Sequence, residues 1–128
     1  MTIHDYLEED ILILTASPIV EHFQIVKRRE TESDGYLRVR AILIGEGLLE
    51  VSIYCQMAEN TVRLVDYRFH WQDREGKIIK RWDNARHHSG LMTFPYHIHL
   101  GSDGNVNESA NVDMSKVLQV LESEIEQI

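Results

Sequence analysis

The segment from Arg81 to His99 concentrates the reactive side chains of this 128-residue chain, including four of its seven histidines. Burying an ionisable group without a partner costs free energy, so packing alone seldom gathers so many in one place. We therefore expect the chemistry of the protein to lie in this segment and the rest of the chain to position it. Its reactive members are Arg81, Asp83, His87, His88, His97 and His99.

One interpretation is cleavage of a phosphodiester bond without a metal. One histidine would remove a proton from a ribose hydroxyl, and another would protonate the leaving oxygen, because imidazole titrates near neutral pH. Arginine presents a planar fork of donors to phosphate. We assign catalysis to His70, Arg81, Asp83, His87, His88, His97 and His99, and substrate binding to Arg68, Asn84 and Arg86.

Two other interpretations remain open. His97 and His99 would share one side of a strand, and with His87 and Asp83 they would offer ligands for zinc or a similar divalent ion. That spacing permits a metal site without specifying one, so we expect no cofactor and keep a divalent metal as the alternative. The third interpretation is a non-catalytic polar loop that binds a partner protein.

Overall charge limits the classes of partner. A formal net charge of -8 argues against indiscriminate binding of nucleic acid, whose affinity comes mainly from neutralised phosphates. Local charge differs, because residues 74 to 88 hold five arginines and lysines against two acidic residues. Such a basic patch on an acidic protein is compatible with one specific anionic substrate.

The length of the chain predicts a single domain, residues 1–128. The acidic triplet Glu8, Glu9 and Asp10 stands where a signal peptide would need a positive region and an apolar run, and no run reaches membrane-spanning length. We therefore expect a cytoplasmic protein that does not associate with a membrane. Cys55 is the one cysteine and lies in an apolar run, which favours a core position.

Helical periodicity marks the two ends of the chain. An apolar face recurs every three or four residues from Ile3 to Leu14, ahead of Pro18, although residues 11–15 alone could also form a strand. Near the other end Asp113 is a suitable N-cap for a helix whose apolar stripe begins at Met114 and continues to Ile128.

Alternation with a period of two predicts strands between these helices. We expect strands over residues 21–30, 36–44, 48–56 and 61–72, then a second arm of a hairpin ending at Asp83, and a short strand within residues 93–100. Residues 101–111 read as a polar loop. Arg38 and Arg40 are expected on a solvated strand face, with anion binding as the alternative.

The hairpin that ends at Asp83 has a register that charge pairing can test. A two-residue turn at Glu75 and Gly76 would avoid setting Arg68 opposite Arg81. This turn would instead set two aromatic side chains opposite each other and a carboxylate opposite an arginine. The predicted pairs are Arg68 with Asp83, Phe69 with Trp82 and His70 with Arg81.

Together these elements predict an α+β fold. A mostly antiparallel sheet of five or six strands in meander order would carry the terminal helices on its apolar face, leaving a shallow polar cleft near Arg68, His70 and Arg81 on the other face. Both tryptophans, Trp71 and Trp82, should be buried. The other expected core residues are Phe23, Ile25, Val39, Leu43, Val51, Ile53, Val65, Phe69, Leu118 and Leu121.

Residues Tyr67 to His99 also resemble the signature of the TumE family of toxins from toxin-antitoxin pairs. The resemblance rests on Phe-His-Trp-Gln-Asp, on Gly-Lys-Ile-Ile-Lys-Arg-Trp-Asp-Asn-Ala, on the paired histidines, and on Thr-Phe-Pro-Tyr-His-Ile-His. It implies a small cytoplasmic prokaryotic toxin with a cognate antitoxin protein as partner. Matching positions are His70, Trp71, Arg81, Trp82, Asp83, Asn84, His87, His88, Phe94, Pro95, His97 and His99.

The chain departs from that pattern at three positions. Family members commonly carry proline where this chain has Arg86 and Ser89, and often histidine where it has Tyr96. These departures give a less rigid loop and one imidazole fewer. Taken with the basic, histidine-rich segment, the resemblance leads us to expect a toxin-like protein that acts on RNA by general acid-base chemistry.

Overall fold

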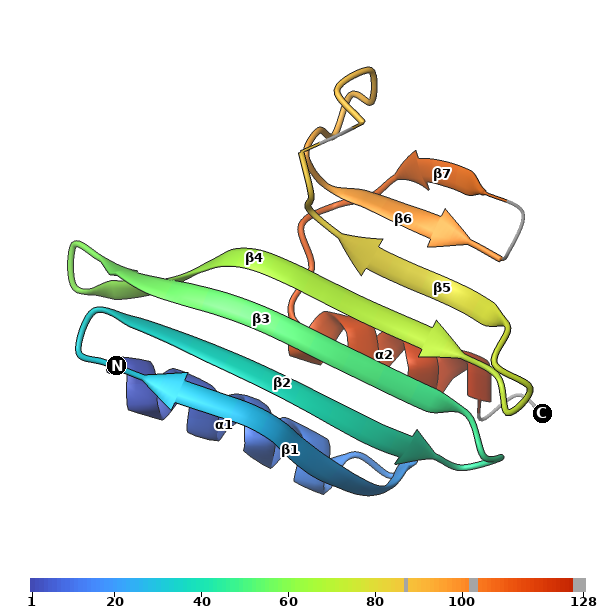
Figure 1. Cartoon of the computed structure of the whole chain (residues 1–128), viewed down its shortest axis with the longest axis horizontal. Helices are drawn as coiled ribbons and strands as arrows, with labels where there is room; N and C mark the ends of the chain where they lie inside the picture. Colours follow the sequence, from blue (N-terminus) through green and yellow to red (C-terminus); the bar gives the residue numbers. More distant parts are fainter. Residues whose placement is uncertain (87, 102–103, 126–128) are drawn as a thin grey trace.

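The computed structural model describes residues 1–86, 88–101 and 104–125, and it has two helices and one sheet (Figure 1). A helix precedes seven strands, and a second helix follows them. The elements are α1 (Ile3–Ala16), β1 (Val20–Glu30), β2 (Asp34–Leu43), β3 (Leu48–Ala58), β4 (Thr61–Gln72), β5 (Ile78–Asp83), β6 (His97–Leu100), β7 (Asn105–Glu108) and α2 (Met114–Ile125).

The strands form one antiparallel sheet in the order in which they occur along the chain, from β1 to β7. The predicted α+β class with an antiparallel sheet is confirmed, whereas the predicted number of strands is wrong. The additional strand is β7, which the sequence analysis placed in a polar loop. Asparagine is uncommon in strands, and Val106 is the only apolar residue of β7, so alternation gives little signal there.

Helix α1 begins with a capping box. The Thr2 hydroxyl accepts a hydrogen bond from the Asp5 backbone N–H, and the Asp5 carboxylate accepts one from the Thr2 N–H. The helix continues to Ala16, so the alternative strand over residues 11–15 is wrong. Ile3, Leu7 and Leu14 are buried against the sheet.

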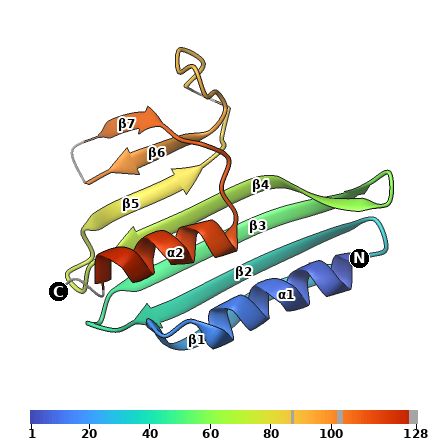
Figure 2. The same ribbon diagram turned by 180° about the vertical axis from the view of Figure 1, so that it is seen from behind.

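Helix α2 begins after Asp113, whose carboxylate accepts a hydrogen bond from the Lys116 N–H at 2.9 Å. Its buried stripe is Met114, Val117, Leu118 and Leu121. The predicted extension to Ile128 lies outside the described residues. The two views show α1 and α2 on the same side of the sheet (Figures 1 and 2). Among the described residues no helix has the length and apolar character needed to cross a membrane.

Most of the predicted core residues are buried, including both tryptophans, and Cys55 is buried with them. Val65 is an exception, with 37% of its surface exposed. The register changes at this point because Tyr54 pairs with Asp66 while Cys55 pairs with Leu64, so Val65 is the extra residue of a β-bulge. The bulge reverses the alternation, and the predicted burial of Val65 is wrong.

Strand β1 is an edge of the sheet and contains two bulges, one after Val20 and one after Ile25. Phe23 is half-buried on it, but Ile25 remains 41% exposed because an edge strand has a neighbour on one side only. The predicted core position of Ile25 is therefore wrong. Val26, which has no pairing partner, is 48% exposed.

The β4–β5 hairpin has the predicted register but a different turn. Arg68, Phe69 and His70 lie opposite Asp83, Trp82 and Arg81. The turn is longer than two residues, because the Asp73 N–H donates to the Lys77 carbonyl and Gly76 takes a positive φ of 86°. A bulge at Ile79 offsets the longer turn, since Trp71 pairs with Lys80 while Gln72 pairs with Ile78.

Candidate functional site

Two parallel rows of polar side chains cross the strands from β2 to β6. In each strand these residues alternate with buried core residues, so the rows lie on the sheet face away from the core. We call this side of the sheet the open face. The first row is Arg38, Ser52, Arg68, Asp83 and His97, and the second row is Arg40, Glu50, His70, Arg81 and His99.

Asp83 and His97 form a buried pair in the first row, with exposures of 5% and 1%. The Asp83 Oδ1 atom lies 2.7 Å from His97 Nε2 and also accepts a hydrogen bond from the Ala85 N–H at 3.1 Å. His97 Nδ1 lies 2.9 Å from the Pro95 carbonyl oxygen, which can only accept, so Nδ1 is the donor. These contacts fix the orientation of the His97 ring.

His99 and Arg81 lie side by side in the second row. Arg81 Nη2 is 3.5 Å from His99 Nε2, and both side chains approach Asp83 Oδ2, at 3.5 Å from Arg81 Nε and 3.4 Å from His99 Nε2. Partial burial and the Arg81 charge lower the pKa of His99 below its usual 6.5, although Asp83 acts in the opposite direction. The lowered pKa favours the neutral form of the His99 imidazole, which can accept a proton.

His88, from the segment between β5 and β6, packs edge-on against the rings of His97 and His99. Its ring centroid lies 4.6 Å from that of His97 and 5.9 Å from that of His99. Ligand nitrogens of the three histidines all lie within 4.8 Å of one another, which is close enough for one metal ion. The bond from His97 to a backbone carbonyl is the kind that orients metal-binding histidines.

That histidine cluster differs from the predicted metal set. It shares His97 and His99 with that set and includes His88, whereas His87 lies outside the described residues. Asp83 is adjacent to two of the three rings, through its contacts with His97 and His99. The arrangement therefore suits two kinds of chemistry, proton transfer by imidazoles and coordination of a divalent ion.

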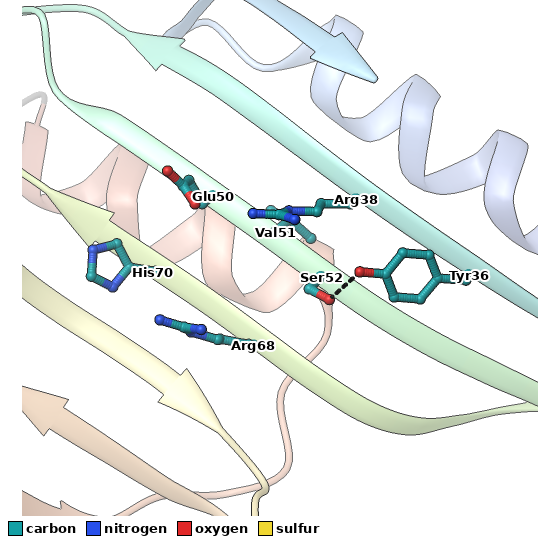
Figure 3. Close-up of a pocket in the computed structure, with 7 residues that line it drawn as sticks. All are labelled: Tyr36, Arg38, Glu50, Val51, Ser52, Arg68 and His70. Atoms are coloured by element: carbon teal, nitrogen blue, oxygen red, sulfur yellow. Dashed lines mark hydrogen bonds between the residues drawn. The ribbon is translucent and has the colours of Figure 1, made fainter. Parts of the chain in front are cut away.

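At the β2 end of the two rows the open face is hollowed by a depression of about 240 Å³ (Figure 3). Arg38 and Arg68 enter it from β2 and β4, with the Ser52 hydroxyl between them in the same row. Tyr36 Oη lies 3.1 Å from Ser52 Oγ. Within the described part of the chain, neither Arg38 nor Arg68 forms an ion pair.

His70 borders the same depression. Its Nε2 lies 3.0 Å from the Gln72 side-chain oxygen, whereas its buried Nδ1 has no hydrogen-bond partner among the described residues. His70 and Arg68 are predicted site residues, whereas Tyr36 and Ser52 are not among those predicted from sequence. The available signal was the alternation of β2 and β3, which places both side chains on the face that carries Arg68.

Asn84 and Arg86 do not join the histidines. The Asn84 side chain completes the edge of β4, accepting from the Tyr67 N–H at 3.0 Å and donating to the Val65 carbonyl at 2.8 Å. Arg86 stacks on the Phe94 ring, 5.0 Å from its centroid. Both residues line a separate depression of about 400 Å³ with Tyr96.

The structure thus brings most of the predicted site residues together. Six of the ten lie in the two rows, and His88 contacts two of them. Asn84 holds the local backbone, Arg86 lies elsewhere, and His87 is not described. The six in the rows are Arg68, His70, Arg81, Asp83, His97 and His99.

Comparison with protein families identifies the chain. A family model described as Toxin TumE matches residues 9–128, nearly the whole length. No curated protein and no solved structure matches the chain. The resemblance noted for residues 67–99 is therefore confirmed and extends from the second half of α1 through the sheet to α2. On the strength of that match, the chain belongs to the TumE family of toxins.

Proposed function

We propose that this protein is the toxin of a toxin-antitoxin pair and cleaves RNA at the site formed by Asp83, His97, His99 and Arg81. The observation that carries the proposal is the contact of Arg81 with His99 at 3.5 Å, beside the buried Asp83–His97 pair. It places a proton acceptor next to a phosphate-binding group. Family membership supplies the toxin-like role, and the site chemistry points to RNA.

In the proposed reaction His99 Nε2 takes the proton of a ribose 2′-hydroxyl, and the 2′-oxygen attacks the adjacent phosphorus. The bond from phosphorus to the 5′-oxygen breaks, and that oxygen receives a proton from His88. The products are a 2′,3′-cyclic phosphate and a free 5′-hydroxyl. Arg81 stabilises the charge that develops on the phosphate.

His97 has a positioning role in this scheme. With 1% of its surface exposed, it has little access to a substrate, whereas His99 and His88 are half-buried. His97 holds Asp83, and Asp83 holds the guanidinium of Arg81 and the ring of His99. This refines the assignment made from sequence, which gave all three histidines a catalytic role.

Cleavage of RNA by the purified protein tests the proposal. His99→Ala should slow cleavage by roughly 10²–10⁴-fold, the usual contribution of a general base. His22→Ala is the matched control, because His22 is exposed on β1. Fragments should end in cyclic phosphate. Cleavage by His99→Ala at the wild-type rate would remove His99 from the mechanism.

The histidine cluster favours a second candidate, a metal-dependent hydrolase acting at the same site. Ligand nitrogens of His88, His97 and His99 lie within 4.8 Å of one another. Chelator treatment followed by addition of Zn²⁺ separates the two chemistries. The acid-base scheme predicts full activity after chelation, whereas loss of activity that zinc restores would favour the metal.

A toxin of this family also implies an antitoxin partner. Viable counts after induced expression test the cellular role, with wild type compared with the His97→Ala/His99→Ala double variant at matched protein levels. We expect loss of viability with wild type alone, and rescue on co-expression of the antitoxin. Equal viability of the two strains would contradict a toxic role for these histidines.

A further inference from the structure

The two rows extend well beyond the histidines. From His97 the first row passes through Asp83 to Arg68, Ser52 and Arg38, and its two arginines meet in the depression of Figure 3. Arg38 and Arg68 have no ion-pair partner among the described residues. Two guanidinium groups that share a depression without a carboxylate partner are suited to bind an anion.

On the other side of the histidines the rows change character. His97 pairs with Glu108 of β7, and His99 pairs with Val106. A carboxylate and an apolar side chain offer nothing to a phosphate. Among the described residues of the two rows, positive charge for a bound polyanion is therefore available on the β2 side of the site and not on the β7 side.

We propose that a single RNA strand lies across the sheet strands, from the histidine site towards β2, with phosphates on one side of the cleaved bond bound by Arg68 and Arg38. This inference rests on the proposed function, since it extends the same site along its substrate. It makes the depression of Figure 3 a phosphate-binding subsite and predicts that only one flank of the RNA contributes to binding.

The spacing of the sheet supports this path. Neighbouring strands lie about 4.8 Å apart, so Arg68 is roughly 10 Å and Arg38 roughly 19 Å from His97 along the first row. These distances let the two arginines reach different phosphates of an extended strand. One line of unpaired arginines follows one backbone, whereas a duplex would present two.

The neighbouring charges leave the row positive. Glu50, the acidic residue that lines the depression, is 3.1 Å from Arg40 Nη2, which offsets its charge. Asp83, the acidic residue within the row, is held by His97, His99 and Arg81. Arg38 and Arg68 are thus the groups that remain for an incoming phosphate.

Binding of a fluorescent single-stranded RNA that carries 2′-O-methyl groups tests the subsite without cleavage. Arg38→Gln and Arg68→Gln should each weaken binding about tenfold, as expected for loss of one charge-assisted contact. Each should also reduce the slope of log K against log salt by about 0.7. Arg38→Lys and Arg68→Lys, which keep the charge, should lose less.

Arg74→Gln is the matched control. It removes the same charge from the β4–β5 turn, where Arg74 is 67% exposed and lies 3.7 Å from Glu46, outside both rows. We expect no change in affinity. Circular dichroism melting of all the variants verifies that they are folded. Wild-type affinity and salt slope in the Arg38→Gln/Arg68→Gln double variant would overturn the subsite.

A second measurement tests the one-sided path. Cleavable RNAs are extended from the cleaved bond on the 5′ flank or on the 3′ flank. We expect kcat/KM to rise with extension of one flank only, and this gain should disappear in the double variant. An equal gain from both flanks would overturn the path. Because the 2′-O-methyl RNA cannot be cleaved, failure of the cleavage proposal remains distinguishable from failure of the subsite.

Discussion

Arg81 touches both ionisable neighbours on the open face, Asp83 and His99. Its positive charge disfavours a proton on His99, and partial burial of that ring acts in the same direction, so the pKa of His99 falls below 6.5. Since the unfolded chain then binds a proton that the folded chain does not, His99 lowers folding stability as pH falls through 6.5.

Replacement of Arg81 should therefore be visible in the titration of His99. In metal-free protein, Arg81→Gln should raise the pKa of His99, because a charge that opposes protonation has been removed. In Arg81→Lys the pKa of His99 should stay below 6.5, as in wild type, since the positive charge remains. NMR titration of the imidazole protons measures both. An unchanged pKa in Arg81→Gln would contradict a contribution of the Arg81 charge.

The pH dependence of RNA cleavage should show the same effect of Arg81 on His99. If His99 is the general base, the acidic limb of the pH profile of kcat/KM lies below 6.5 in wild type and moves to higher pH in Arg81→Gln. The loss of the phosphate-binding group lowers the maximum rate as well. The pH of the acidic limb reports the effect of the Arg81 charge on the pKa of His99, whereas the maximum rate also reports the loss of phosphate binding.

Helix α1 packs closely against β2 at Gly35. At Gly35 a Cβ atom would stand 2.6 Å from Ile3 Cγ2, and 3.3 Å from both Leu7 Cδ1 and Cys55 Sγ. No side chain fits there without movement of α1 or β3. Glycine at this position allows the N-terminal helix to lie directly on the sheet.

Gly35→Ala should therefore separate α1 from β2 and lower the free energy of unfolding by about 1–3 kcal/mol, as overpacking does in a dense core. Gly90→Ala is the control, because nothing lies within 4 Å of its Cβ position and its φ is not positive. Its effect should stay within about 0.5 kcal/mol. Urea denaturation compares the two, and equal stabilities would contradict close packing at Gly35.

Bulges account for some of the errors in the strand predictions. Periodicity assigns Val65 to the core because it shares parity with Tyr67, yet the bulge after Leu64 shifts the phase of β4. The β4–β5 register was correctly predicted from charge pairing even though the turn was not, because the bulge at Ile79 compensates for the longer turn. Local sequence carries little sign of such bulges, since they depend on which strand lies alongside.

At the scale of the whole molecule, the first helix, α1, packs against the last helix, α2. Asp10 of α1 is 7% exposed, and burial raises its pKa to about 7, with further contributions from the charges of Asp113 and Glu9. The folded chain thus holds a proton that the unfolded chain releases near pH 4. This carboxyl destabilises the fold progressively as pH rises from about 4 to 7.

Asp10→Asn should stabilise the protein above pH 7, by an amount whose upper bound is roughly 4 kcal/mol. The gain should shrink as pH falls and vanish near pH 4, where Asp10 is neutral in both states. Glu21→Gln, at an exposed position on β1, is the control and should change little. Thermal unfolding across this pH range measures the difference, and a gain independent of pH would contradict the raised pKa.

Sequence alone identified much of the histidine site because its members lie close together in the chain. His97 and His99 could be placed beside Arg81 and Asp83 from strand alternation within one segment. The alignment of β2 and β3 residues with this site was not predicted, although anion binding by Arg38 was kept as an alternative, because it requires the register of strands that are distant in sequence. Arg38 reaches the row only through Ser52 and Arg68.

The bulges of β1 also affect how the sheet meets other copies of itself. An exposed edge strand can recruit another chain into the sheet, and bulges and charged side chains oppose such addition. Strand β1 carries two bulges and the charged run from Lys27 to Glu30. At the opposite edge, β7 spans only Asn105–Glu108. Both edges are thus poor templates for aggregation, and the sheet should stop at seven strands rather than grow by self-association.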